Sequence, residues 1–199
     1  MGRTEPVART VGGVSRLIHL NGPPGVGKST LARRYVADHP GTLNCDVDVL
    51  RSLVGGWEAD FVGAGALIRP AALAMIEAYL GTGQDVVLPQ MLIRPTELAR
   101  FEGAASAANA EFVERFVMDE RDAVVARFHR RGDSDPAPWH RQVREIVAGQ
   151  GGDEHLLRCH DALERLLAER PQAVAIVSRD GAVEATYRAL LDSLAPSPG

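Results

Sequence analysis

The sequence of 199 residues is poor in several residue types and segments, and each shortage narrows what the chain can be. It has only two cysteines, Cys45 and Cys159, which are too few for a disulfide framework and indicate a reducing compartment. No apolar run approaches the ~18 residues of a membrane-spanning helix. The start of the chain also lacks the apolar core of a secretory signal. We therefore expect a cytoplasmic protein with no membrane partner.

The charge balance lacks a basic surplus. The formal net charge is −4, which argues against a broad basic surface for duplex nucleic acid. The remaining composition, with 45% hydrophobic and 24% charged residues, is typical of a folded domain rather than a disordered chain. At this length we expect one domain.

Lysine is almost absent. Of the 22 basic residues, Lys28 is the only lysine and all others are arginine. Because arginine serves as the cation everywhere else, the position of Lys28 is expected to require a compact ammonium group.

Short apolar runs typical of strands alternate with amphipathic helical segments. This alternation predicts an α/β fold with a five-stranded parallel sheet and helices on both faces. The predicted strands are 16–21, 42–45, 85–89, 111–118 and 172–177, and the predicted helices are 28–38, 68–80, 96–107, 121–130, 140–147, 154–169 and 183–194. We expect a flexible N-terminus over 1–15, a single domain over 16–194 with a lid at about 129–152, and a tail over 195–199.

Two stretches are irregular and read first as surface loops. Residues 55–65 hold four glycines together with Trp57 and Phe61, and residues 132–139 form a proline-rich break between two helices. Loops often carry binding residues, so the first is a candidate acceptor-binding loop and the second a candidate lid.

A phosphate-binding loop follows the first predicted strand. Its residues match G-x-x-x-x-G-K-[ST] and are Gly22, Pro23, Pro24, Gly25, Val26, Gly27, Lys28, Ser29 and Thr30. The glycines let successive backbone N–H groups point at phosphates, and the following helix adds its positive N-terminal end. In such loops the lysine bridges the β- and γ-phosphates and the serine hydroxyl binds Mg²⁺, so ATP and Mg²⁺ are the expected ligands.

Further residues distinguish between the classes of protein that use such a loop, which include GTPases, ATPases and kinases. A guanine-reading Asn-Lys-x-Asp motif needs a second lysine, so a GTPase is excluded. A hydrolytic ATPase needs a strand ending in Asp-Glu, which Asp119 and Glu120 match, although Asp119 is more simply the N-cap of the next helix. This ATPase interpretation is kept as an alternative.

A phosphotransferase needs a carboxylate base and cations around the transferred group. Asp46 and Asp48 follow the second strand on the same side of the chain, and either could be the base or only cap the next helix. The candidate cations lie at the end of the helix over 121–130, with Arg131 first and Arg127 second.

At these residues the chain resembles the small P-loop kinases that include polynucleotide kinase, gluconate kinase, chloramphenicol phosphotransferase and the zeta toxins. The match is carried by Pro40-Gly41, by Asn44-Cys-Asp-Val-Asp48-Val-Leu-Arg51, by Arg127-Phe-His-Arg-Arg131-Gly132 and by Ser178-Arg-Asp-Gly181. The resemblance implies a P-loop kinase fold, Asp48 as general base, Arg51 as an acceptor or phosphate contact, lid arginines at Arg127 and Arg131, and an adenine-side loop at 178–181.

The combined reading is an ATP-dependent kinase that transfers the γ-phosphoryl group to a hydroxyl of a small molecule of sugar, antibiotic or nucleoside type. The expected acceptor contacts are Asp46, Arg51, Trp57, Phe61 and Gln90. Gln90 stands where the polynucleotide kinases place an acidic residue, so a polynucleotide 5′-hydroxyl is the less favoured acceptor.

Five possible metal ligands cluster on the helix predicted over 154–169, and they are Glu154, His155, Cys159, His160 and Asp161. His155 and Cys159 are one helical turn apart, which could be half a metal site. Because no second cysteine or histidine pair completes it, the cluster is interpreted as part of an ordinary amphipathic helix rather than a zinc site.

Overall fold

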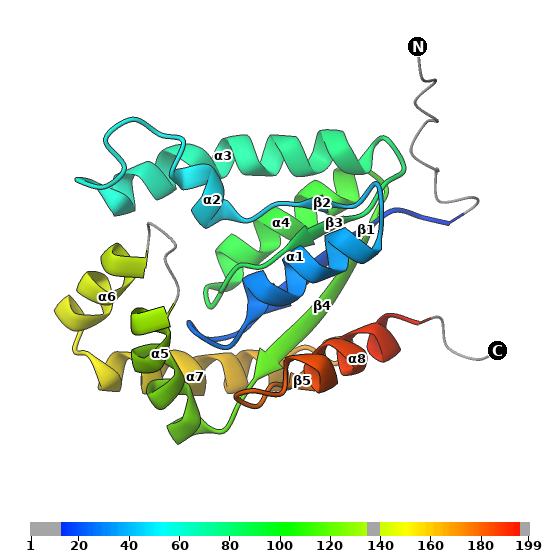
Figure 1. Ribbon diagram of the computed structural model, residues 1–199. Coiled ribbons are helices and arrows are strands. Elements are labelled where there is room, and N and C mark those ends of the chain that lie inside the picture. Colours follow the sequence, from blue (N-terminus) through cyan, green and yellow to red (C-terminus); the bar gives the residue numbers. More distant parts are fainter. Residues whose placement is uncertain (1–12, 135–139, 196–199) are drawn as a thin grey trace, which may run out of the picture.

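A single sheet of parallel strands organises the computed structural model, which describes residues 13–134 and 140–195 (Figure 1). The strand order is β2-β3-β1-β4-β5, and every neighbouring pair is parallel. The strands are β1 (Arg16–Asn21), β2 (Leu43–Asn44), β3 (Val86–Leu88), β4 (Glu111–Met118) and β5 (Val174–Val177). The predicted α/β fold with a five-stranded parallel sheet is confirmed.

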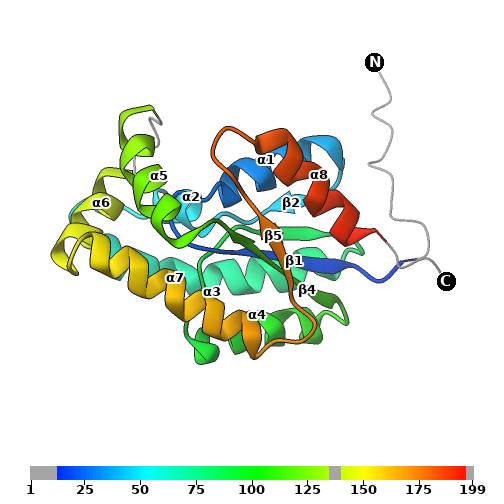
Figure 2. The same cartoon turned by 90° about the horizontal axis from the view of Figure 1, so that it is seen from below.

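Helices cover both faces of the sheet, as Figure 2 shows from below. They are α1 (Lys28–Asp38), α2 (Val47–Arg51), α3 (Phe61–Leu80), α4 (Pro95–Ala107), α5 (Arg121–Ser134), α6 (His140–Gly149), α7 (Asp153–Ala168) and α8 (Val183–Leu194). One apolar core joins the sheet to α1 and α8, and a second joins it to α3, α4 and α7. A third, smaller cluster holds α5, α6 and α7 together around Phe128, Val147 and Leu156.

Several predicted bounds differ from the structure, and the largest differences lie at the two irregular stretches and at α2. The loop expected over 55–65 ends early, because the side chain of Asp60 accepts a 2.8 Å hydrogen bond from the N–H of Gly63 and starts α3 at Phe61. The short helix α2 was expected only as the helix that Asp46 or Asp48 would cap and had no predicted bounds, since five residues are too few to show a helical period. The break expected over 132–139 starts later, because α5 continues to Ser134. Residues 135–139 of that break lie outside the described residues.

The ends of the predicted domain are only partly described, since residues 1–12 and 196–199 lie outside the described part. Ser15 belongs to the fold: its hydroxyl donates to the carbonyl of Leu80 at 3.1 Å, and its own carbonyl accepts from Glu111 N–H at 2.9 Å. The folded region therefore begins before Arg16. Cys45 and Cys159 are both buried and neither forms a disulfide.

Among the described helices, α3 is long and apolar enough to cross a membrane by length and composition, with a mean hydropathy of 1.4. Its inner face packs in the core through Ala72, Ile76 and Leu80, and Arg69 forms an ion pair with Glu97 of α4 at 3.2 Å. One face of α3 thus packs against the core and against α4, and 22% of its apolar window is buried. The absence of a membrane partner stays a prediction.

Candidate nucleotide and acceptor site

The phosphate loop lies between the carboxyl end of β1 and the first turn of α1. Gly22 has a φ of +145°, and a Cβ there would lie 2.2 Å from the carbonyl oxygen of Val117, so no larger residue fits. Gly27 precedes α1 with a φ of 106°, and no side chain caps the helix. The N–H groups of the first turn are therefore available for an anion at the positive end of the helix.

Lys28 folds back over this loop. Its Nζ donates hydrogen bonds to the carbonyl oxygens of Gly22 at 2.7 Å and Pro23 at 2.8 Å. The ammonium group thus lies at the mouth of the loop, on the side where Ser29 also faces a pocket. This placement explains the single lysine of the chain, because a compact three-donor group fits two converging carbonyls better than a planar guanidinium does.

Asn21 joins the phosphate loop to the segment that follows β3, and this role was not predicted from the sequence. Its Oδ1 accepts from the N–H of Gly22 at 2.9 Å and of Leu92 at 3.0 Å, and its Nδ2 donates to the carbonyl of Leu92 at 2.9 Å. Two residues earlier on β1, His19 Nε2 lies 2.8 Å from the carbonyl oxygen of Gln90. One indication of these contacts was present in the sequence, because His19 and Asn21 are polar residues in a strand that is otherwise mostly apolar.

Replacing Asn21 with leucine is expected to lower the free energy of unfolding by about 3 kcal/mol, because it leaves buried backbone groups of Gly22 and Leu92 without partners. Urea unfolding of the two proteins measures the difference. The control is Gln172→Leu, at an exposed position, with an expected change within about 0.5 kcal/mol. Equal losses in both variants would show that Asn21 has no special structural role.

A pocket of about 400 Å³, here named the α8-side pocket, opens on one side of the phosphate loop. It is lined by Gly25, Val26, Gly27, Thr30, Leu31, Arg127, Arg130, Ser178, Arg179, Asp180, Val183 and Thr186. The segment expected to pass near adenine, 178–181, thus forms one wall of a pocket beside the phosphate loop.

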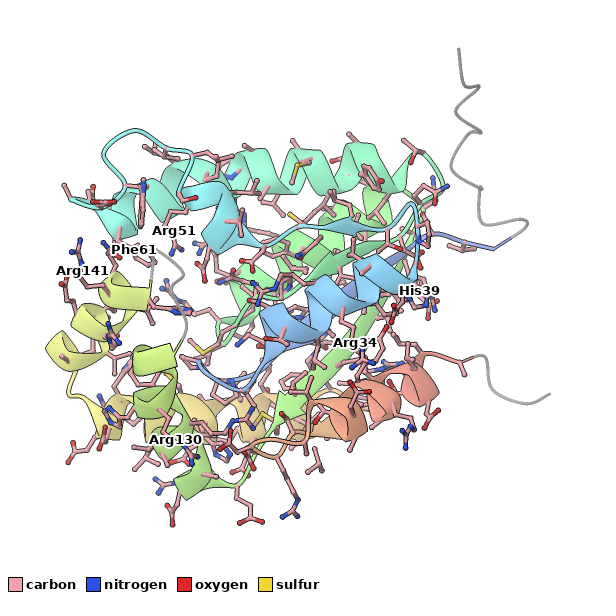
Figure 3. The ribbon with its side chains drawn as sticks, in the orientation of Figure 1. Arg34, His39, Arg51, Phe61, Arg130 and Arg141 are labelled. Atoms are coloured by element: carbon pink, nitrogen blue, oxygen red, sulfur yellow. The ribbon has the colours of Figure 1, made fainter. Side chains whose placement is uncertain are left out.

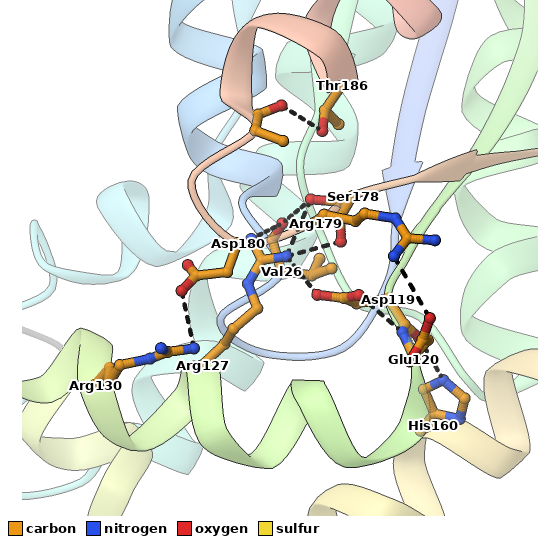
Figure 4. Close-up of polar contacts among 11 residues, drawn as sticks. Val26, Asp119, Glu120, Arg127, Arg130, His160, Ser178, Arg179, Asp180 and Thr186 are labelled. Atoms are coloured by element: carbon orange, nitrogen blue, oxygen red, sulfur yellow. Dashed lines mark hydrogen bonds and ion pairs between the residues drawn. The ribbon is translucent and has the colours of Figure 1, made fainter.

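Arg127 ties the phosphate loop to the walls of the α8-side pocket (Figure 4). Its guanidinium donates to the carbonyl of Val26 at 3.0 Å and of Ser178 at 2.8 Å, and it forms a 2.8 Å ion pair with Asp119. Arg130, on the same helix, pairs with Asp180 at 2.8 Å. These contacts make Arg127 a residue that positions the loop. A direct role in catalysis stays a prediction.

A second pocket of about 270 Å³, here named the α6-side pocket, opens on the other side of the loop. It is lined by Pro24, Gly25, Lys28, Ser29, Asp48, Arg51, Phe61, Pro89, Gln90, Met91, Phe128, His140, Val143, Arg144, Ile146, Val147, Gln150 and His155. The two pockets share Gly25, so both meet at the phosphate loop.

The two candidate carboxylates have different surroundings. Asp46 is 4% exposed, and its Oδ1 accepts from the N–H of Asp48 at 3.0 Å as the N-cap of α2. Asp48 lines the α6-side pocket and forms a 2.8 Å ion pair with Arg51. Burial raises the pKa of Asp48, and the charge of Asp46 adds to this while Arg51 opposes it. Asp46 therefore caps a helix, whereas Asp48 faces a pocket.

Arg51 is a buried cation at the wall of the α6-side pocket. Its guanidinium carbon lies 3.8 Å from the centre of the Phe61 ring, and Figure 3 shows the two side chains beneath α2 and α3. Gly65 makes room for it, because a Cβ there would lie 3.0 Å from Arg51 Nε. Phe61 thus lines the α6-side pocket, whereas Trp57 does not, and the centres of the two rings lie 6.5 Å apart. Acceptor contacts of Phe61 and Trp57 stay predictions.

Other predicted residues have mixed outcomes. Gln90 lines the α6-side pocket, and its buried Oε1 has no hydrogen-bond partner among the described residues. The side chain of Arg131 lies outside the described part of the chain. Arg144 and His155 line the pocket but were not predicted to do so. Arg144 could have been predicted to line the pocket, because it lies beside the apolar Val143-x-x-Ile146-Val147 pattern of α6.

Solved structures with similar folds include the following three. The APS kinase CysC of Mycobacterium tuberculosis, in complex with AMPPNP and APS, is 20% identical with a TM-score of 0.57, over 90% of this chain and 97% of that one. A gluconokinase from Sinorhizobium meliloti 1021 is 19% identical with a TM-score of 0.55, over 90% and 92%. A chain of the Pnkp1/Rnl/Hen1 RNA repair complex is 16% identical with a TM-score of 0.60, over 82% and 48%.

At these identities the likeness shows the fold alone, which is that of P-loop nucleotide-binding proteins. Comparison with curated proteins gives no match. A family model described as an AAA domain matches residues 17–150, which is more than half of the chain and includes the phosphate loop and both predicted carboxylates. The chain therefore belongs to the AAA_33 family of AAA domains.

Proposed function

We propose that this protein is an ATP-dependent kinase that phosphorylates a hydroxyl group of a small molecule. The observation that carries the proposal is the placement of two pockets that meet at Gly25 of the phosphate loop. An enzyme that only hydrolyses ATP needs a nucleotide pocket and a water molecule. A second pocket with its own carboxylate, on the far side of the loop, is what an acceptor requires.

The residues of the loop fit a nucleotide triphosphate and Mg²⁺. The uncapped N-terminus of α1 and the positive φ of Gly22, Gly25 and Gly27 form a backbone cradle in which side chains are missing. Ser29 would hold Mg²⁺ through its hydroxyl, and Lys28 would neutralise phosphate charge. When bound, ATP supplies the phosphoryl group and the metal ion supplies positive charge beside it.

The chain's own residues would then divide the remaining work. Asp48 accepts the proton of the acceptor hydroxyl, and Arg51 holds Asp48 in place through the 2.8 Å ion pair. Phe61 and the apolar side of α6 cover the α6-side pocket and exclude water. A pocket of about 270 Å³ suits a small acceptor, which supports a small molecule over a polynucleotide end.

The ATPase alternative gains no support from the geometry. Asp119 is 5% exposed and is committed to its ion pair with Arg127. Glu120 lies on the surface, 3.6 Å from Arg179, and neither residue lines one of the two pockets. Neither carboxylate is therefore placed where metal and water would meet a nucleotide in these pockets, which favours the kinase proposal.

The rate of transfer is expected to rise with pH through the pKa of Asp48. That pKa lies above the ordinary carboxyl value of 3.8 because burial disfavours the charged form, and only the charged form accepts a proton. The acid limb of a kcat against pH profile should disappear in Asp48→Asn. An unchanged acid limb in that variant would assign the titration to another group.

The experiment that tests the proposal is transfer of label from γ-labelled ATP in two separate pools. One pool holds small hydroxylated metabolites and antibiotics, and the other holds 5′-hydroxyl oligonucleotides. We expect label on a compound of the first pool, which mass spectrometry then identifies. Label on the oligonucleotides would replace the proposal with a nucleic-acid end kinase, and free phosphate alone would replace it with an ATPase.

A further inference from the structure

Three potential metal ligands lie together on α7, outside both pockets. They are His160, Asp161 and Glu164, and their ligand atoms all lie within 4.8 Å of one another. His160 Nδ1 lies 3.8 Å from a carboxylate oxygen of Asp161 and 3.8 Å from one of Glu164. These distances are too long for hydrogen bonds, so the three groups lie close together without bonding to each other.

The hydrogen bond of His160 fixes which ring nitrogen carries a proton. Nε2 lies 3.0 Å from the carbonyl oxygen of Asp119, and a carbonyl only accepts, so Nε2 carries the hydrogen. In a neutral imidazole Nδ1 then presents a lone pair. His160 is 2% exposed, and its Nδ1 has no hydrogen-bond partner among the described residues. A cation bound between this buried lone pair and the two carboxylates would give Nδ1 a partner.

We propose that His160 Nδ1, Asp161 and Glu164 form a binding site for a divalent transition metal ion, with Zn²⁺ as the first candidate. One imidazole nitrogen and two carboxylates are a donor set that Zn²⁺ accepts, with solvent completing the coordination. Histidine ligands of metals usually donate their other N–H to a carboxylate or a backbone carbonyl, which fixes the ring. The bond from His160 to Asp119 has this form.

The site is connected to the α8-side pocket through Asp119 (Figure 4). The carbonyl of Asp119 accepts from His160, and its carboxylate pairs with Arg127, which holds the carbonyl of Val26 in the phosphate loop. A metal ion on Nδ1 makes Nε2–H a stronger donor and holds the ring still. The ion would therefore stabilise the turn between β4 and α5 without touching ATP or the acceptor.

Arg121 competes with a metal ion for one of the ligands. Its Nε and Nη2 donate to the two carboxylate oxygens of Asp161 at 2.8 and 3.3 Å. Removing this cation leaves Asp161 free to turn toward the metal. Arg121→Ala should therefore tighten binding by about 2- to 5-fold, the range that corresponds to an exposed ion pair. A surface that binds metals through scattered carboxylates would show no such gain.

The test is calorimetric titration of Zn²⁺ into the full chain, without nucleotide, after removal of metals with a chelator. We expect one site in the wild type and at least a ~10-fold loss of affinity in Glu164→Gln, whose side chain is 61% exposed and does not support the core. His160→Gln should show the same loss. The matched control is Glu154→Gln on the same helix, 85% exposed, with unchanged affinity.

A rival site is checked in the same titration. His155 Nε2 lies 3.5 Å from Cys159 Sγ, one turn away on α7, and these residues could also bind Zn²⁺. Cys159→Ser should leave the affinity unchanged. Loss of binding in Cys159→Ser but not in Glu164→Gln would overturn the proposal, and so would an absence of binding in the wild type.

Discussion

Replacing Asp48 with asparagine is expected to slow phosphoryl transfer by about 10²- to 10⁴-fold, the range for loss of a positioned general base. Asparagine has nearly the same size and cannot accept the proton of the acceptor. The affinity for ATP should change little, because Asp48 faces the α6-side pocket and does not line the α8-side pocket. Steady-state kinetics and ATP binding, measured on the same preparation, separate the two effects.

Two controls keep this result interpretable. Asp48→Asn removes the counter-charge of Arg51, which is 6% exposed, so its unfolding must be measured to exclude a simple loss of fold. Asp192→Asn, on an exposed part of α8, should behave as the wild type. Full transfer by a folded Asp48→Asn would remove Asp48 as the base and return attention to Asp46.

Replacing Lys28 with alanine is expected to abolish most transfer, with a fall of about 10²- to 10³-fold in kcat, as for loss of a group that stabilises transition-state charge. ATP binding should also weaken, by about 10-fold or more, which corresponds to ~1.4 kcal/mol. Lys28 bonds the carbonyls of Gly22 and Pro23 and lies where the phosphates are expected. Its loss therefore affects both the shape and the charge of the loop.

The matched variants are Lys28→Arg and Arg33→Ala. Arginine keeps the charge but places it on a larger planar group, so Lys28→Arg should remain strongly impaired. Arg33 is an exposed cation on α1, and its removal should leave activity within about twofold. Normal transfer by Lys28→Ala would mean that the segment from Gly22 to Thr30 does not bind the transferred phosphate.

The strands and the phosphate loop could be predicted because their signals are local. The apolar run at Arg16–Asn21, the glycines after it and the helical period of Lys28–Asp38 each specify one element, and these boundaries agree with the structure. Parallel pairing then follows from the strand–helix alternation. The place of Asp48 at a pocket followed from the rule that ligands bind at the carboxyl ends of parallel strands.

The remaining features depend on contacts between distant segments. Asn21 bonds Leu92, and Arg127 bonds Val26 and Ser178, so no local window of sequence shows either role. The α3 boundary depends on one capping bond to Asp60. Trp57 lies near Phe61 in the chain, yet only the packing of α3 determines which ring reaches the pocket.

The most direct test of the central claim is a rapid-quench, single-turnover measurement with γ-labelled ATP and the acceptor identified from the pools. We expect label to pass straight to the acceptor hydroxyl in the wild type, and Asp48→Asn to slow this step by about 10²-fold or more. Label that appears as free phosphate, at the same rate with and without the acceptor, would contradict it. In that case the protein would be an ATPase and the α6-side pocket would not be an acceptor site.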